Sequence, residues 1–177
     1  MLEVGGRVDG TGAEMLPEHR EPTVRHAVRL IMLDDLDRLL LFSGIDSTDG
    51  ATFWYPIGGG REPGETPRQT AAREAEEETG RTDLVVGPEL WRRRALVTWD
   101  GTTYDCHERY FLTRVPCFDI DTTGFTALER ATVTGHHWWT LPELTTTPAR
   151  IAPGELVTRL TDLLRDGPPP TPITLAH

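Results

Sequence analysis

Two neighbouring stretches of the chain decide its fold. Residues 58–65 read Gly-Gly-Gly-Arg-Glu-Pro-Gly-Glu, and residues 73–80 read Arg-Glu-Ala-Glu-Glu-Glu-Thr-Gly. The composition between them predicts a helix over residues 67–79, with Thr66 as the N-cap, a proline in the first turn and Gly80 as the terminator. The sequence therefore predicts a glycine-rich turn that leads directly into an acidic helix.

The predicted helix carries three glutamates on one face. Glu74, Glu77 and Glu78 are spaced i, i+3 and i+4, so their carboxylates lie close together. A glutamate-rich helix is usually a solvated face, but like charges at this spacing cost roughly 0.2–0.5 kcal/mol per pair. A hard cation such as Mg²⁺ or Mn²⁺ would gather these oxygens and bridge them to substrate phosphates. Arg73 lies four residues before Glu77 and can pair with it.

Residues 59–81 resemble the Nudix box, Gly-x5-Glu-x7-Arg-Glu-U-x-Glu-Glu-x-Gly-U, in which U is an aliphatic residue. The seven fixed positions are all occupied, by Gly59, Glu65, Arg73, Glu74, Glu77, Glu78 and Gly80. At the two U positions, Ala75 is small but apolar, and Arg81 departs from the pattern. The resemblance extends over about residues 25–165, because Trp-Tyr-Pro-Ile-Gly-Gly-Gly before the box and Trp-Trp-Thr-Leu-Pro-Glu-Leu after it also look like the family.

The resemblance implies an α+β fold, the Nudix α/β/α sandwich, in which a mixed β-sheet lies between helices. It also implies a pyrophosphohydrolase that cleaves the pyrophosphate linkage of a nucleoside diphosphate derivative (a nucleotide, nucleotide sugar or dinucleotide) with Mg²⁺ or Mn²⁺. The small-molecule substrate would be the main partner, and a homodimer is a further hypothesis from the family.

The resemblance also implies a role for each residue of the box. Glu74 and Glu78 would be metal ligands, and Glu77 would be a further ligand or the base that deprotonates water. The carbonyl of Gly58 would ligate a metal, and Arg73 would orient Glu77. The other fixed residues and one further glycine would support the loop and the ends of the helix: Gly59, Glu65 and Gly80, together with Gly60.

The rest of the chain divides into three parts. Residues 1–24 are rich in Gly, Glu and Pro and predict a flexible or loosely docked arm, residues 25–166 the Nudix domain, and residues 167–177 a proline-rich, disordered tail. Hydrophobic patterns and turn signals predict strands over 26–33, 38–42, 53–55, 91–99, 103–115 and 132–140. A short helical turn is predicted at 141–144, and an amphipathic helix over 153–165.

The composition narrows the function further. The chain has 177 residues, with 18 basic and 28 acidic side chains, and every basic residue is an arginine. A net charge of -10 argues against nonspecific nucleic-acid binding. The two cysteines predict free thiols in a reducing cytoplasm rather than a disulfide scaffold, and no apolar run approaches the roughly 18–20 residues of a membrane span.

Several residues outside the box are candidates for the site. Glu108 would either face the pocket, toward substrate or metal, or pair with an arginine such as Arg93. Glu129 is the first candidate for an additional acid, followed by Asp119 and Asp121. Trp54 and Tyr55 would either stack on a base or pack in the core.

Two further groups have more ordinary interpretations. Residues 92–94 are three consecutive arginines, and side chains alternate along a strand, so those on at most one face could contact a phosphate. The alternative is that they form a solvated basic edge of the sheet. A zinc site built from Cys106, His107, Cys117 and His136–His137 is not expected, because the spacing matches no Cys-x-x-Cys pair.

Two other functions are open at this stage. One is a non-catalytic nucleotide sensor on the same fold, which would be expected to lack Glu77 or Glu78. The other is an isoprenoid diphosphate isomerase, whose chemistry relies on a catalytic cysteine and a metal-binding histidine, so that only Cys106 or Cys117 could serve it. In the Nudix family, a proline or a tyrosine shortly after the box often marks enzymes that prefer ADP-ribose or dinucleoside polyphosphates. Here no proline lies between Pro88 and Pro116, and the first tyrosine after the box is Tyr104, so neither marker selects a substrate.

Overall fold

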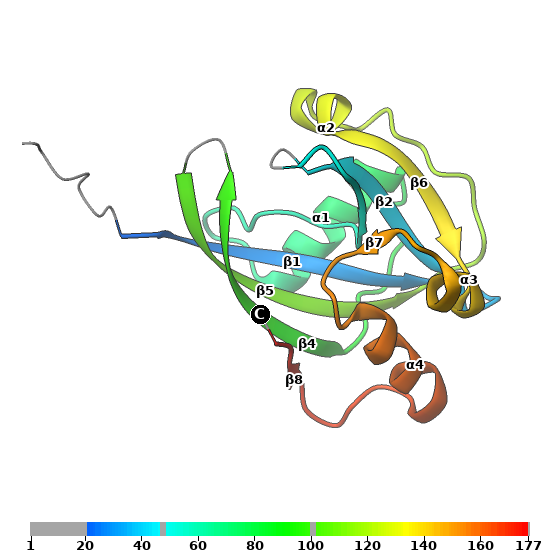
Figure 1. The fold of residues 1–177 in the computed structure, drawn as a ribbon. Coiled ribbons are helices and arrows are strands. Elements are labelled where there is room, and N and C mark those ends of the chain that lie inside the picture. Colours follow the sequence, from blue (N-terminus) through cyan, green and yellow to red (C-terminus); the bar gives the residue numbers. More distant parts are fainter. Residues whose placement is uncertain (1–20, 47–48, 100–101, 177) are drawn as a thin grey trace, which may run out of the picture.

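A single curled, mixed sheet runs through the computed structural model, which describes residues 21–46, 49–99 and 102–176 (Figure 1). The strand order is β7-β3-β2-β1-β5-β4-β8, and β6 pairs with β2 outside this path. The strands are β1 Thr23–Leu33, β2 Leu39–Ile45, β3 Thr52–Tyr55, β4 Glu89–Trp99, β5 Thr102–Arg114, β6 Val133–Trp139, β7 Arg150–Ile151 and β8 Ile173–Thr174. The helices are α1 Pro67–Thr79, α2 Ala127–Thr132, α3 Leu141–Thr146 and α4 Leu156–Asp166.

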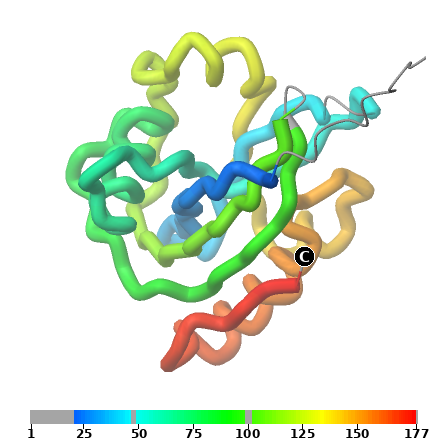
Figure 2. The backbone as a smooth tube through the Cα atoms, turned by 90° about the vertical axis from the view of Figure 1, so that its left-hand side faces the viewer, coloured from blue at the N-terminus to red at the C-terminus, as the bar shows by residue number. Residues whose placement is uncertain are grey.

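Strand β1 shows how the two faces of the sheet are covered. Its alternating side chains Val28 and Leu30 belong to a core that includes Ala71 and Ala75 of α1. The intervening Ile31 belongs to a second core, with Leu156, Leu160 and Leu163 of α4. Helices therefore cover both faces of the mixed sheet, with α1 and α4 on opposite sides of β1 (Figure 2), and the predicted α+β architecture is confirmed.

The glycine-rich segment continues the sheet along one edge of β1. The amide of Leu30 donates to Ile57 O and that of Val28 donates to Gly59 O, both at 2.9 Å. The amide of Arg61 donates to the carbonyl of His26, also at 2.9 Å. Because β1 is paired with β5 on its other edge, these bonds fix the glycine segment against the centre of the sheet.

Helix α1 has the predicted bounds. Thr66 forms a capping box with Gln69, and Gly80 ends the helix in the left-handed conformation at φ 73°. Both signals are local, so the sequence places this helix correctly.

The expectation of a disordered tail over 167–177 is wrong for the described residues up to 176. Ile173–Thr174 forms β8, parallel to β4, and the amide of Leu175 donates to Arg92 O at 2.8 Å. Leu175 is only 3% exposed, because it belongs to the core beneath α4. This burial gives the tail the apolar contact that its proline-rich composition does not indicate.

Other boundaries differ in smaller ways. Strand β1 begins at Thr23, inside the expected arm, and α4 begins at Leu156 rather than at 153. Helix α2 and strand β7 are not among the predicted elements. The first 20 residues of the arm and the turn at 100–101 lie outside the described residues. In the part of the chain that the structure describes, no helix is both long and apolar enough to cross a membrane.

Candidate active site

The glycine segment and the last turn of α1 meet through Glu78. The amide of Gly58 donates to Glu78 Oε2 at 2.6 Å. Glu78 is 3% exposed, and burial raises the pKa of its carboxyl well above the usual range, although the hydrogen bond from Gly58 opposes this shift. The site therefore contains a carboxylate whose negative charge has little solvent to stabilise it.

Glu74 lies one turn earlier, directly beneath Gly59. It is 5% exposed, and burial raises the pKa of its carboxyl. A Cβ on Gly59 would lie 2.5 Å from both Glu74 carboxylate oxygens, a distance that real Cβ atoms do not show. Only glycine lets the backbone approach this carboxylate so closely.

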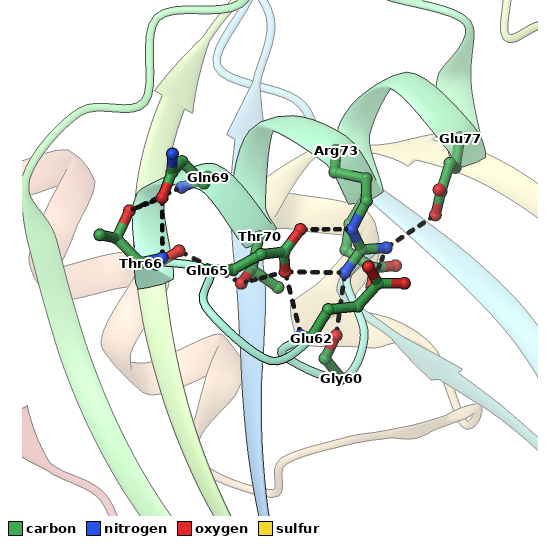
Figure 3. Close-up of polar contacts among 9 residues, drawn as sticks. Gly60, Glu62, Glu65, Thr66, Gln69, Thr70, Arg73 and Glu77 are labelled. Atoms are coloured by element: carbon green, nitrogen blue, oxygen red, sulfur yellow. Dashed lines mark hydrogen bonds and ion pairs between the residues drawn. The ribbon is translucent and has the colours of Figure 1, made fainter.

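Arg73 joins the loop to the helix (Figure 3). Its Nε lies 2.8 Å from Glu65 Oε1, and its Nη2 donates to the Gly60 carbonyl at 2.9 Å. Its Nη1 lies 2.9 Å from Glu77 Oε2 and 3.0 Å from Glu74 Oε1. The predicted contact between Arg73 and Glu77 is thus present, and the same guanidinium also contacts two further carboxylates.

Glu65 anchors the loop at the start of α1. The hydrogen bond from Arg73 is the main cause that lowers the pKa of its carboxyl to about 2. Glu65 Oε2 also accepts hydrogen bonds from the Glu62 amide at 3.0 Å and from Thr70 Oγ1 at 2.9 Å. Glu65 therefore remains ionised at neutral pH and holds the loop to the first turn of the helix.

Glu77 occupies a different environment from its two neighbours. Its side chain is 36% exposed, whereas Glu74 and Glu78 are buried. A Cβ on Gly124 would lie 2.5 Å from Glu77 O, so the loop before α2 packs tightly on this side of α1. Glu77 is thus the one of the three glutamates most open to solvent and to a ligand.

The additional-acid candidates occupy three places. Glu129 caps α2 through the Thr126 amide at 2.6 Å, and its charge adds to the burial that raises the pKa of Glu74 and Glu78. Asp121 lies against Gly80 at the end of α1, and its carboxylate accepts from the Thr123 amide at 2.9 Å. Asp119 is exposed. Glu129 therefore retains the strongest electrostatic link to the box.

Glu108 pairs with arginines, which is one of the two arrangements predicted for it. Its carboxylate lies 3.1 Å from Arg29 Nε and 3.1 Å from Arg93 Nη1, and it accepts from the Tyr110 hydroxyl at 2.8 Å. Arg29 Nη1 also donates to the Gly58 carbonyl at 2.9 Å. Arg29 is not among the predicted site residues, although a lone arginine inside the apolar run of β1 is a signal that could have found it.

The aromatic candidates belong largely to the two cores. Trp54 packs edge-to-face on Trp139, with ring centroids 5.1 Å apart, beside the core under α4. Tyr55 packs against the core under α1, and burial raises the pKa of its hydroxyl to about 12.

The box residues offer oxygen donors only. No three His, Cys, Asp or Glu side chains converge as a metal-binding group in the part of the chain that is described, since Glu74 and Glu77 are turned to Arg73 and Glu78 is turned to Gly58. Carboxylates with a neighbouring backbone carbonyl are nevertheless the donors that Mg²⁺ and Mn²⁺ prefer. Two buried carboxyls with raised pKa values would gain from a cation, so the residues present fit such an ion.

Comparison with known proteins bears on this arrangement. A family model described as NUDIX domain matches residues 23–160. Among curated protein sequences, no match to this chain is found.

Solved structures share the fold at low sequence identity. A NUDIX hydrolase from Nitrosomonas europaea is 24% identical, with a TM-score of 0.60, over 84% of this chain and 91% of that one. The MutT protein from Methanosarcina mazei Go1 is 17% identical, with a TM-score of 0.59, over 83% and 97%. The NUDIX domain of Shewanella oneidensis NrtR, complexed with ADP ribose, is 15% identical, with a TM-score of 0.59, over 86% and 95%.

The family match spans strands β1 to β7, helices α1 to α3 and the start of α4, and it includes every fixed residue of the box. The chain therefore belongs to the Nudix family.

Proposed function

We propose that the chain hydrolyses the pyrophosphate linkage of a nucleoside diphosphate derivative in a reaction that depends on Mg²⁺ or Mn²⁺. The observation that carries this proposal is the pair of buried carboxyls, Glu74 and Glu78, which lie against the glycine segment with raised pKa values. A bound divalent ion would lower the pKa of water and neutralise phosphate charge that these carboxylates would otherwise repel.

Each box residue has a task in this proposal. Glu74 and Glu78 would hold the ion together with the Gly58 carbonyl, which also accepts a hydrogen bond from Arg29. Glu77 is either a further ligand or the base that takes a proton from the attacking water. Arg73 keeps Glu77 in place, because its guanidinium is itself fixed by Glu65 and by the Gly60 carbonyl.

The substrate class comes from the chemistry of the family rather than from a shaped base pocket. Proteins of similar fold include an E. coli dihydroneopterin triphosphate pyrophosphohydrolase and the NrtR domain bound to ADP ribose. A cytoplasmic location fits two free cysteines, and a homodimer is part of the proposal.

A panel of nucleoside diphosphate derivatives tests the proposal, with products identified by mass. We expect turnover with Mg²⁺ or Mn²⁺ and none with chelator. Glu77→Gln is expected to lower kcat by about 100-fold or more, whereas Glu76→Gln, an exposed neighbour outside the fixed box positions, retains wild-type activity. A panel that gives no product, or equal activity of the two variants, would contradict the proposal.

The same panel tests for a nucleotide sensor, and the cysteines bear on the isomerase. A nucleotide sensor would bind a panel member in calorimetry and release no product. An isoprenoid diphosphate isomerase would need a reactive thiol, and burial raises the pKa of Cys106, which disfavours its thiolate. Incubation with an isoprenoid diphosphate, with products identified by mass, tests this alternative directly.

A further inference from the structure

A cavity of about 420 Å³ lies between the start of α1 and the sheet, on the side of the box loop. Its wall comes from β1, β5 and β4, from Thr174 of β8, and from Arg61 and Pro67 around the loop. Small-molecule sites commonly measure roughly 300–1,000 Å³. The cavity therefore has room for a small ligand.

The residues that line this cavity are mainly basic, whereas the chain as a whole is acidic. The protein carries a net charge of -10, yet among the described residues the only acidic one in the wall is Glu108. The basic residues in the wall are Arg61, Arg92, Arg93, Arg94 and Arg109, accompanied by His26 and His107.

Strand register shows which of these side chains enter the cavity. Val28, Arg109 and Arg92 form one cross-strand row. Residues two positions along each strand form another row, which contains His26, His107 and Arg94. Val28 packs in the core under α1, so both rows face the α1 side. In the row between them, Arg93 and Glu108 form an ion pair with each other.

The arginines around the cavity outnumber the carboxylates that pair with them. Glu89 is shared by two arginines, since its Oε1 lies 2.7 Å from Arg92 Nε and 2.9 Å from Arg109 Nε. Asp105 is bound by Arg94 and lies 3.2 Å from His107 Nε2. Within the described residues, the Arg61 side chain makes no ion pair or hydrogen bond. An anion would therefore find two guanidinium charges without a carboxylate of their own.

We propose that this cavity, whose wall includes Arg61 of the box loop, binds a phosphate-bearing small molecule. Arg92 and Arg109 both donate hydrogen bonds to Glu89 through Nε and Nη2. Their Nη1 hydrogens are therefore available to donate to a ligand. Planar guanidinium forks suit phosphate oxygens, which accept two hydrogen bonds at once. A ligand in the cavity would be linked to the box through Arg61. The Arg61 amide donates to the His26 carbonyl, and the preceding carbonyl, that of Gly60, accepts a hydrogen bond from Arg73.

Calorimetric titration with inorganic phosphate and with AMP, in chelator and at low salt, tests this site without any turnover. The double variant Arg61→Gln/Arg92→Gln is expected to raise the Kd for both probes at least tenfold. It is expected to fold, because Arg61 is exposed and Glu89 keeps Arg109. The control Arg150→Gln/Arg165→Gln removes the same charge from exposed ion pairs elsewhere and should leave the Kd within twofold.

Absence of saturable binding by the wild type, or equal weakening in both double variants, would overturn the proposal. A hydrolase that proves inactive leaves this titration unaffected, so the two proposals fail separately. Where turnover is found, kinetics identify the source of the phosphate. A KM that rises in Arg61→Gln/Arg92→Gln with kcat unchanged assigns the cavity to a distal phosphate of the substrate, and an unchanged KM assigns it to a separate ligand.

Discussion

Gly59 has no room for a side chain, and this single restriction shapes the site. A Cβ at this position would lie 2.5 Å from the carboxylate oxygens of Glu74. Gly59→Ala must therefore displace Glu74 from the glycine segment. We expect at least a tenfold loss of kcat/KM and of Mn²⁺ affinity, measured by steady-state kinetics and metal titration.

Gly154→Ala provides the matched control for that substitution. Apart from Gly154 itself and its two chain neighbours, no heavy atom of the described residues lies within 4 Å of a Cβ at this position. Equal kinetic constants for Gly59→Ala and Gly154→Ala would show that Glu74 does not need its present position.

At the residue scale, the box could be read from spacing alone. Three glutamates at i, i+3 and i+4 and an arginine four residues before one of them define contacts within one helix, and the structure shows the pair of Arg73 with Glu77. Arg29 could not be found in this way. Its contacts with Gly58 and Glu108 are made across 29 and 79 residues, and they depend on the pairing of β1 with β5.

At the scale of the element, the cap of α1 links stability to activity. Thr66 Oγ1 accepts from the Gln69 amide at 3.3 Å, and the Thr66 amide donates to the Gln69 side chain at 2.8 Å. Thr66→Ala should lower the free energy of unfolding by about 1 kcal/mol, measured by urea denaturation. It should also reduce turnover, because the first turn of α1 carries the loop that Glu65 anchors.

Thr140→Ala separates these two effects. Thr140 forms the same capping box with Glu143 on α3, which supplies no residue to the candidate site. A similar loss of stability with unchanged turnover is expected. If both variants reduce turnover equally, stability alone explains the effect of Thr66→Ala.

The elements themselves were predictable to different degrees. Helix α1 has caps, a proline and a terminal glycine within its own sequence, so its bounds are correct. Strands β7 and β8 have two residues each, and their partners β3 and β4 lie far away in sequence. Such strands exist only because the fold provides an edge, and no local pattern could predict them.

At the scale of the whole molecule, the C-terminal segment contributes to stability. Leu175 is buried in the core under α4. Leu175→Ala should lower the free energy of unfolding by about 2–3 kcal/mol, as other buried leucines do. The neighbouring exposed Ala176→Ser serves as the control in the same denaturation experiment, and identical midpoints would contradict a structural role for the tail.

Acid stability offers a second test at this scale. Burial opposes ionisation of Glu89, but hydrogen bonds from Arg109 and Arg92 outweigh it and lower the pKa of the carboxyl to about 2. Because the folded pKa is below the unfolded value, Glu89 stabilises the fold above about pH 4.5, and this contribution is lost as the pH falls toward 2. Glu89→Gln should show a smaller loss of unfolding free energy over that range than the wild type, while Glu76→Gln should match the wild type.

The parallel pairing of β1 with β5 has a consequence for the synthesis of the chain. The two strands are aligned over their length, from Thr23 with Tyr104 to Leu33 with Arg114. At roughly 5–20 residues per second, a ribosome needs about 4–16 s to supply the partner of β1. Throughout that interval the apolar run from Leu30 to Leu33, which is fully buried in the finished protein, has one open edge on the nascent chain. Codons that slow translation between β1 and β5 would therefore lengthen the period in which this protein is most prone to aggregate.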